Sequence, residues 1–359
     1  MTRVATEMTV ALESPRWLDP QWRDGALDWV RARLDEQGRS VLGEVEQPHV
    51  YPWSTVLRVP TAEGPVWFKA SARGTAYEVP LLTALGSWCP KRVLVSLAAD
   101  ADRGWLLLPD GGTTLRVAQG GQTDVAHWEK VLVEYAELQR LLAARAEEMV
   151  ALGVPDLRPA ALPGHLADLL ADEPALMVDE PDGITSADLA RLRSEQDRFA
   201  QSCGELAATG VPSSVQHDDL HDANIFLPYD GSGPYRVFDW GDASVAHPFT
   251  TLLVTLRVVA HFGKLPNGAP ELFRLRDAYI EAWTGEHDRS TLLEACRLAL
   301  LTGPLGRALS YRRSLLDATP SARARHGDGV PGWLVDLGAP GSLDPDPDVD
   351  PDIDATAGS

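Results

Sequence analysis

The sequence has few lysines, few cysteines and no long apolar run. Its formal net charge is −20 over 359 residues, which disfavours nucleic acid as a partner because phosphate backbones bind basic surfaces. Its three cysteines (Cys89, Cys203, Cys296) show neither metal-ligand nor disulfide spacing. No segment is apolar for the length of a membrane span, and Met1–Ser14 lacks the apolar run of a signal peptide. We therefore expect a cytoplasmic protein without a nucleic-acid or membrane partner.

Basic residues are also missing from the C-terminal end. Residues 341–359 contain six aspartates, most of which alternate with proline, and neither Lys nor Arg. Proline removes backbone donors and like charges repel, so residues 339–359 are predicted to form a disordered acidic tail. The remaining acidity is interpreted as a solubilising surface.

At this length one compact core is not expected, and the hydrophobic periodicity changes along the chain. Apolar residues at helical spacing predict a helix over Trp17–Gln37. Segments rich in β-branched and aromatic residues then predict a small sheet with one helix inserted. The expected strands are Thr55–Val59, Val66–Ala70, Val93–Leu97 and Trp105–Leu108, and the expected helix is Tyr77–Leu85.

Beyond Gly111–Gly112 the pattern is mostly helical. Three-and-four spacing predicts helices over 125–142 and Ser186–Ala207, and three or four more within Phe249–Leu316. A polar loop and a hairpin that turns at Asp230–Pro234 interrupt them. We expect an α+β protein with a small sheet-based lobe and a larger helical lobe.

The loop before this hairpin contains the most informative residues. His217, Asp219 and Asn224 are its first, third and eighth positions, and Asp239 follows at the end of the next apolar segment. Phosphoryl transfer needs a carboxylate that accepts the proton of an attacking hydroxyl, and oxygen ligands for Mg²⁺. Asp219 can be that base, and Asn224 and Asp239 can be the ligands. A single acidic residue would more often be a turn former, but the whole set favours a catalytic site.

This stretch resembles the catalytic loop, His-Gly-Asp-x-x-x-x-Asn, of the aminoglycoside phosphotransferase and choline kinase family, relatives of protein kinases. The resemblance implies that Asp219 is the base, that Asn224 and Asp239 bind Mg²⁺, and that His217 braces the loop. His221 also fits the family pattern. The resemblance spans roughly residues 41–316 and implies a bilobal protein-kinase-like fold. Its parts would be an N-terminal extension (1–40), a nucleotide-binding lobe (41–110) and a catalytic lobe (111–338).

Two departures from the family pattern stand out. Asp218 replaces the glycine before the base, and two neighbouring carboxylates would raise the pKa of one of them if both are buried. The Asp-Pro-x-x-Asp segment of many members is replaced by His247–Thr251, which affects subfamily placement more than activity.

The first lobe agrees with this interpretation. Lys69 lies within an apolar predicted strand, and the chain has only four lysines among 32 basic residues. By the family pattern Lys69 binds the α- and β-phosphates of ATP, Glu78 pairs with it, and the backbone near Leu108 and Asp110 meets the adenine at the hinge. A strand lysine that only snorkels to solvent is the structural alternative. No glycine-rich loop is present where one is expected, at Gln47–Ser54.

The sequence thus predicts an ATP- and Mg²⁺-dependent kinase that phosphorylates a hydroxyl group of a small molecule such as an aminoglycoside, sugar or amino alcohol. The alternatives are a protein serine/threonine kinase and a weakly active nucleotide-binding pseudokinase. The segment 145–200 carries twelve acidic residues against five arginines. In this family it would cover the acceptor cleft, so we also predict an acceptor with positive charge.

Overall fold

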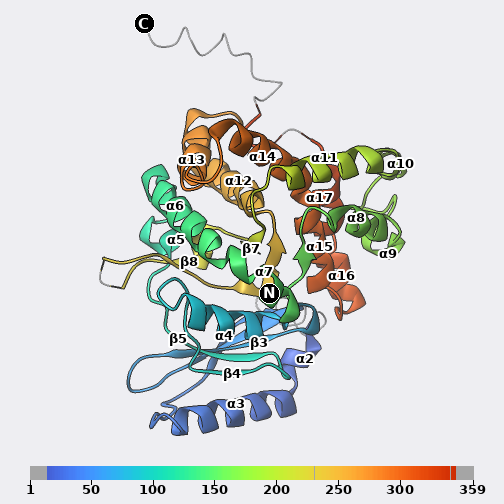
Figure 1. Cartoon of the computed structure of the whole chain (residues 1–359). Coiled ribbons are helices and arrows are strands. Elements are labelled where there is room, and N and C mark those ends of the chain that lie inside the picture. Colours follow the sequence, from blue (N-terminus) through green and yellow to red (C-terminus); the bar gives the residue numbers. More distant parts are fainter. Residues whose placement is uncertain (1–13, 230, 340, 345–359) are drawn as a thin grey trace, which may run out of the picture.

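The computed structural model describes residues 14–229, 231–339 and 341–344. An antiparallel sheet in the order β1-β2-β3-β5-β4 forms the N-terminal part, and the rest is mostly helical (Figure 1). Its strands are β1 (Glu46–Tyr51), β2 (Ser54–Val59), β3 (Val66–Ser71), β4 (Ala98–Asp100) and β5 (Trp105–Pro109). The predicted α+β class is confirmed.

Each face of this sheet is covered by helix. On one side lie α2 (Pro15–Leu18) and α3 (Pro20–Asp35), and on the other lies α4 (Glu78–Trp88) (Figure 1). Alternate residues of β3 bury Val66, Phe68 and Ala70 in the cluster that α3 completes. Because side chains alternate across a strand, Lys69 projects from the opposite face, toward α4.

One strand prediction and one loop prediction were wrong. Residues 93–97 do not form a strand: Val93 makes an isolated bridge to Val237, and β4 begins at Ala98. Val93 and Leu94 are apolar because they are buried, and Val93 packs in the main hydrophobic cluster of the chain. Further upstream, most of Gln47–Ser54, where a loop was expected, belongs to β1. Only Pro52 and Trp53 separate β1 from β2.

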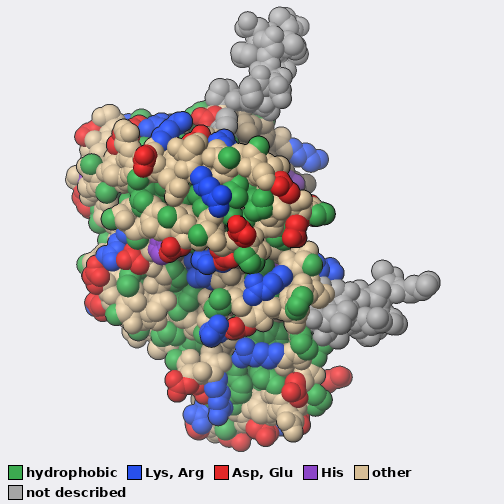
Figure 2. All heavy atoms as spheres, turned by 90° about the vertical axis from the view of Figure 1, so that its right-hand side faces the viewer, with side chains coloured by type: hydrophobic (Ala, Val, Ile, Leu, Met, Phe, Trp, Pro, Cys, Tyr) green, Lys and Arg blue, Asp and Glu red, His purple; other side chains and the backbone are tan. Residues whose placement is uncertain are grey.

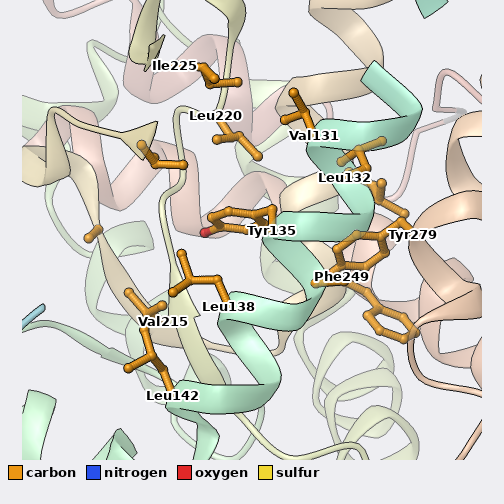
Figure 3. Packing of buried hydrophobic residues seen from close by; sticks show 14 of the residues in the cluster. Val131, Leu132, Tyr135, Leu138, Leu142, Val215, Leu220, Ile225, Phe249 and Tyr279 are labelled. Atoms are coloured by element: carbon orange, nitrogen blue, oxygen red, sulfur yellow. The ribbon is translucent and has the colours of Figure 1, made fainter. Parts of the chain in front are cut away.

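The helical part is built around α6 (Val125–Leu142), which forms where the sequence predicted it. Its apolar face (Val131, Leu132, Tyr135, Leu138 and Leu142) points toward Val215, Leu220, Ile225, Phe249 and Tyr279 (Figure 3). These partners come from the loop region and from the C-terminal helices. The polar loop therefore packs on the same hydrophobic core as α6.

The later helices follow the predictions with one break. Three or four helices were expected within Phe249–Leu316, and the structure has α12 (Thr251–Gly263), α13 (Pro270–Glu281), α14 (Arg289–Thr302) and α15 (Pro304–Ser314) there. The single helix expected over residues 186–207 is instead α10 (Ser186–Ser194) and α11 (Gln196–Ala208), because Glu195 leaves the helical conformation. The shorter helices are α5 (Leu115–Ala118), α7 (Ala146–Ala151), α8 (Leu162–Leu170), α9 (Glu173–Leu176), α16 (Pro320–His326) and α17 (Gly329–Val335).

Short strands frame the polar loop. The strands β6 (Asp156–Leu157), β10 (Ser244–Ala246) and β7 (Ser214–Gln216) form a three-stranded sheet in that order. The predicted hairpin consists of β8 (Ile225–Phe226) and β9 (Arg236–Val237). The loop thus begins at the end of β7 and ends at the start of β8.

Several expectations concern the surface and the C-terminal end. Acidic and basic side chains are interspersed on the face shown in Figure 2, where the net charge does not gather into one acidic patch. All three cysteines are buried and free. No helix among the described residues has the length and hydropathy needed to cross a membrane.

Most of the predicted tail, residues 345–359, lies outside the described residues. At its start, the carbonyl of Ser342 accepts a hydrogen bond from Gly268, and Leu343 packs on the core.

Candidate active site

The loop from His217 to Asn224 is held by hydrogen bonds of the His217 ring. The Nε2 atom of His217 lies 2.8 Å from the carbonyl oxygen of Phe238, and its Nδ1 atom accepts from the amide of Asp219. This ring therefore ties the loop to the strand that leads to Asp239. Burial lowers the pKa of His217 despite the nearby carboxylates, so its ring is neutral. The bracing position predicted for His217 is observed.

Asp218 has a backbone conformation that explains the glycine of the family pattern. Its φ is 62°, in the left-handed region that glycine, asparagine and aspartate adopt most easily. Its side chain is buried and accepts a 2.5 Å hydrogen bond from Ser244. Burial raises the pKa of Asp218 to about 6. Of the two neighbouring carboxyl groups, Asp218 and Asp219, the one with the raised pKa is thus Asp218.

Asp219 lies between two basic side chains. Its Oδ2 is 3.3 Å from His221 Nε2, and its Oδ1 is 3.4 Å from a guanidinium nitrogen of Arg307. Burial alone would raise the pKa of Asp219, but the charge of Arg307 and the contact with His221 outweigh it and hold this pKa well below its usual range. Asp219 is therefore ionised at neutral pH.

Lys69 connects the N-terminal sheet to the helical part. Its ammonium is 2.7 Å from the Glu78 carboxylate and 2.5 Å from Asp239 Oδ1. Ser71 also donates to Glu78 at 3.1 Å. Burial would lower the pKa of Lys69, but the two carboxylates outweigh this effect and raise it. The predicted pairing of Lys69 with Glu78 is confirmed, and the snorkelling alternative is wrong.

Asp239 and Asn224 lie beside each other at the end of the hairpin. The carbonyl of Asn224 accepts from the amide of Phe238, the residue before Asp239. The amide nitrogen of Asn224 donates to the Asp219 carbonyl at 3.0 Å, which leaves its amide oxygen as the atom that can bind a cation. Asp239 has a φ of 64° and keeps half of its side chain exposed.

An apolar slot of about 380 Å³ opens next to Lys69. The end of β5 forms one wall, where Leu108, Pro109 and Asp110 follow one another at the predicted hinge. Gly111 lies so close to Phe226 that a Cβ atom would be 2.1 Å from the ring. Further lining residues are His49, Ser54, Val56, Trp67, Lys69, Glu78, Leu82, Leu94, Gly112, Thr114, Phe238 and Asp239. The slot has apolar walls and a charged end.

A second, smaller cavity of about 190 Å³ also borders Lys69, and we call it the inner cavity. It is lined by Trp53, Ser54, Lys69, Thr75, Glu78, Asp219, Asp239, Gly241, Asp242, Arg307, Tyr311 and Ser314. Four of these residues (Ser54, Lys69, Glu78 and Asp239) also line the slot. The two spaces therefore meet at the charged residues, and Asp219 faces only the inner cavity.

Several residues of the inner cavity were not identified from the sequence, among them Arg307, Tyr311 and Asp242. Arg307 and Tyr311 come from α15, and Asp242 follows Asp239 in the short helix Trp240–Asp242. No local motif marks Arg307, since the chain is rich in arginine and its contact with Asp219 joins distant segments. Asp242 was detectable in principle, as a further carboxylate three residues after Asp239.

The acidic segment predicted to cover the acceptor cleft does not line the inner cavity at any described position. Several of its carboxylates are instead paired with arginines. Asp156 and Glu147 contact Arg158, and Asp172 contacts Arg312. The prediction of a cationic acceptor therefore has no support from this cavity and stays a prediction.

Comparisons with known proteins agree with this geometry. Residues 44–293 match the family described as "Phosphotransferase enzyme family". No curated protein matches the sequence.

Among solved structures, a macrolide 2'-phosphotransferase type I superposes with a TM-score of 0.54 at 17% identity, covering 88% of this chain and 97% of that one. An ethanolamine kinase of Plasmodium vivax gives 0.53 at 11%, with 82% and 83% covered. A choline/ethanolamine kinase family protein from Mesorhizobium loti gives 0.52 at 16%, with 89% and 96% covered. At these identities the structures establish the shared fold.

Proposed function

Because the chain belongs to the phosphotransferase enzyme family, we propose that it transfers the γ-phosphoryl group of ATP to a hydroxyl group of a small molecule. The family match confirms the resemblance found in the sequence, and the chain is a phosphotransferase. No comparison supports the alternative of a protein serine/threonine kinase. The pseudokinase alternative is disfavoured because the positions of the base, the two metal ligands and the phosphate-binding lysine hold Asp219, Asn224, Asp239 and Lys69.

One observation carries this proposal. The Lys69 ammonium contacts Glu78 and Asp239 at the same time, at the point where the apolar slot meets the inner cavity. A nucleotide base needs an apolar slot, its phosphates need a fixed cation, and an acceptor needs a carboxylate beyond them. The slot, Lys69 and Asp219 follow one another in that order.

The slot fits a nucleotide base in its chemistry. Its walls are leucine, valine and phenylalanine side chains, and Phe226 and Phe238 stack with ring centroids 4.2 Å apart. The backbone near Leu108 and Asp110 lies at its edge, where peptide groups can hydrogen-bond a purine. We assign the adenine of ATP to this slot and the phosphates to Lys69.

Asp219 would orient the acceptor hydroxyl and accept its proton. It is ionised at neutral pH, and its carboxylate borders the inner cavity. His221 and Arg307 lie 3.3 and 3.4 Å from its two carboxylate oxygens, so their attraction favours one direction of the side chain before the acceptor arrives. General-base catalysis of this type contributes roughly 10²–10⁴-fold to a rate.

The oxygen atoms of Asn224 and Asp239 fit a Mg²⁺ ion. Magnesium usually binds through one or two carboxylates together with substrate phosphates and water. Within residues 14–229, 231–339 and 341–344, no group of three or more His, Cys, Asp or Glu side chains could hold a metal alone. Asn224 and Asp239 would therefore bind Mg²⁺ together with phosphate oxygens of the nucleotide. When bound, the ion would neutralise phosphate charge.

The acceptor is assigned only as a small molecule. The inner cavity, at about 190 Å³, holds the reacting part of an acceptor, and its wall of Trp53 and Tyr311 is partly aromatic. The solved relatives act on different molecules according to their names, a macrolide and an ethanolamine among them. An acceptor with positive charge remains a prediction from the sequence.

The test is acceptor-dependent formation of ADP from Mg·ATP. The purified protein is incubated with aminoglycosides, macrolides, sugars and amino alcohols in turn, and a general protein substrate is included. We expect ADP release to rise with one small-molecule class, with the phosphorylated product visible by mass spectrometry. Phosphorylation of the protein substrate alone, or failure to bind Mg·ATP, would contradict the proposal.

A further inference from the structure

Arg307 has hydrogen-bond donors that the described residues do not use. Its side chain is only 8% exposed, and it lines the inner cavity. Neither its Nε nor its Nη1 atom has a hydrogen-bond partner. A buried donor without a partner is destabilising, and more so when it belongs to a charged group. Such a group at the wall of a cavity indicates a ligand that accepts these hydrogen bonds.

Lys69, the other basic residue that lines the inner cavity, is already paired with carboxylates. Lys69 is bound at 2.7 and 2.5 Å by two carboxylates. Arg307 is 3.4 Å from Asp219 and 3.9 Å from Asp242, and both contacts are longer than hydrogen bonds to a guanidinium usually are. Arg307 can therefore donate to a further group without giving up an established bond.

Aromatic contacts hold the guanidinium in place. Its carbon lies 5.3 Å from the ring centroid of Tyr311 and 5.8 Å from that of Trp333 on α17. A cation–π contact does not replace a hydrogen bond, so the Nε and Nη1 donors of Arg307 remain without a partner beside these rings. The arginine thus combines aromatic neighbours with unused donors.

We propose that Arg307 binds a phosphate-like oxyanion in the inner cavity, next to Asp219. The planar guanidinium matches such a group because two parallel N–H donors reach two of its oxygens. The inference rests on the proposed function. The oxyanion is either the terminal phosphoryl group of ATP or an anionic group on the acceptor.

The first measurement compares two nucleotides by calorimetry, Mg·ADP and a Mg-bound non-hydrolysable ATP analogue. If Arg307 contacts the terminal phosphoryl group, Arg307→Met weakens analogue binding by about 10- to 100-fold, the usual effect of a hydrogen bond to a charged group, and leaves ADP binding unchanged. Arg307→Lys keeps the charge without the fork of donors and gives a smaller loss.

Arg312→Met is the matched control. It removes an arginine from the same helix, where Arg312 pairs with Asp172 at 2.7 Å and does not line the inner cavity. This variant should bind both nucleotides like the wild-type protein. Thermal unfolding shows whether each variant is folded, and Arg307→Lys serves as the test if Arg307→Met is not.

The second measurement places the oxyanion on the acceptor instead. Inorganic phosphate is titrated into the complex with the ATP analogue, in which the terminal phosphoryl position is filled. Binding to the wild-type complex that is lost in Arg307→Met assigns the donors to an anionic acceptor group. Unchanged affinities in both measurements would overturn the inference while Mg·ADP binding keeps the proposed function intact. Failure of the wild-type protein to bind Mg·ADP would contradict the proposed function itself.

Discussion

The buried carboxyl of Asp218 makes the protein less stable at neutral pH than it would be with an amide at this position. Its pKa is about 6 in the folded protein, against an ordinary value of 3.8, because burial disfavours the charged form. Asp218→Asn removes the ionisable group and keeps an acceptor for Ser244. Asparagine also tolerates the φ of 62°. The substitution therefore changes the charge with little effect on the backbone.

The sign and size follow from the two pKa values. Between pH 4 and 6 the folded state binds more protons than the unfolded state, so the free energy of unfolding falls as the pH rises. A change of pKa from 3.8 to about 6 corresponds to about 3 kcal/mol, fully lost above pH 6. We expect Asp218→Asn to be more stable than the wild-type protein by up to that amount at pH 7.5, with the difference shrinking toward pH 4.

Urea denaturation at a series of pH values from 4 to 8 measures this difference directly. Asp218→Gly serves as a second variant, because glycine adopts the left-handed backbone and also lacks the carboxyl. Both variants should lose the same part of the pH dependence, whatever their absolute stability. If the difference between Asp218→Asn and wild type were the same at pH 4 and pH 7.5, the carboxyl would not be the buried acid described here.

Three further substitutions test other parts of the site. Lys69→Met should lower kcat/KM by about 10²-fold or more, since it removes a fixed cation, and should lower the melting temperature because a buried Glu78 loses its partner; steady-state kinetics and calorimetry check both. Asp239→Ala should abolish Mg²⁺-dependent nucleotide binding, whereas Asn224→Ala should weaken it less, since a carboxylate binds a hard cation better than an amide; equal losses by isothermal titration would contradict the assignment. Gly111→Ala should lower the free energy of unfolding by about 1–3 kcal/mol, because its methyl group overlaps the ring beside it; an unchanged urea midpoint would show that the ring can move aside.

Hydrophobic periodicity correctly predicted the helices and strands that bury a single face. The helix α6 formed as expected because its apolar spacing reports a single buried face. Val93 and Leu94 misled the strand prediction because both are buried, and burial produces the same apolar run as a strand. The break at Glu195 has no glycine or proline to mark it, so periodicity joined α10 and α11.

In the candidate site, too, local features could be predicted from the sequence and contacts between distant segments could not. The loop of His217, Asp219 and Asn224 was recognisable because its residues are close in sequence and their spacing is constrained. The pairing of Lys69 with Glu78 was predictable from an unusual lysine in an apolar strand. Arg307 was not, because only the packing of α15 brings it to Asp219. Contacts between distant segments leave no periodic signal in one sequence.

The role of Asp219 is the central claim, and one substitution tests it. Asp219→Asn preserves the shape of the side chain but cannot accept the hydroxyl proton. With the acceptor found in the screen, transfer of labelled γ-phosphate is measured for both proteins, and Mg·ADP binding verifies that the variant is folded. We predict unchanged nucleotide binding and a loss of roughly 10²–10⁴-fold in kcat. A variant that keeps more than about a tenth of the wild-type kcat would contradict the assignment of Asp219 as the base.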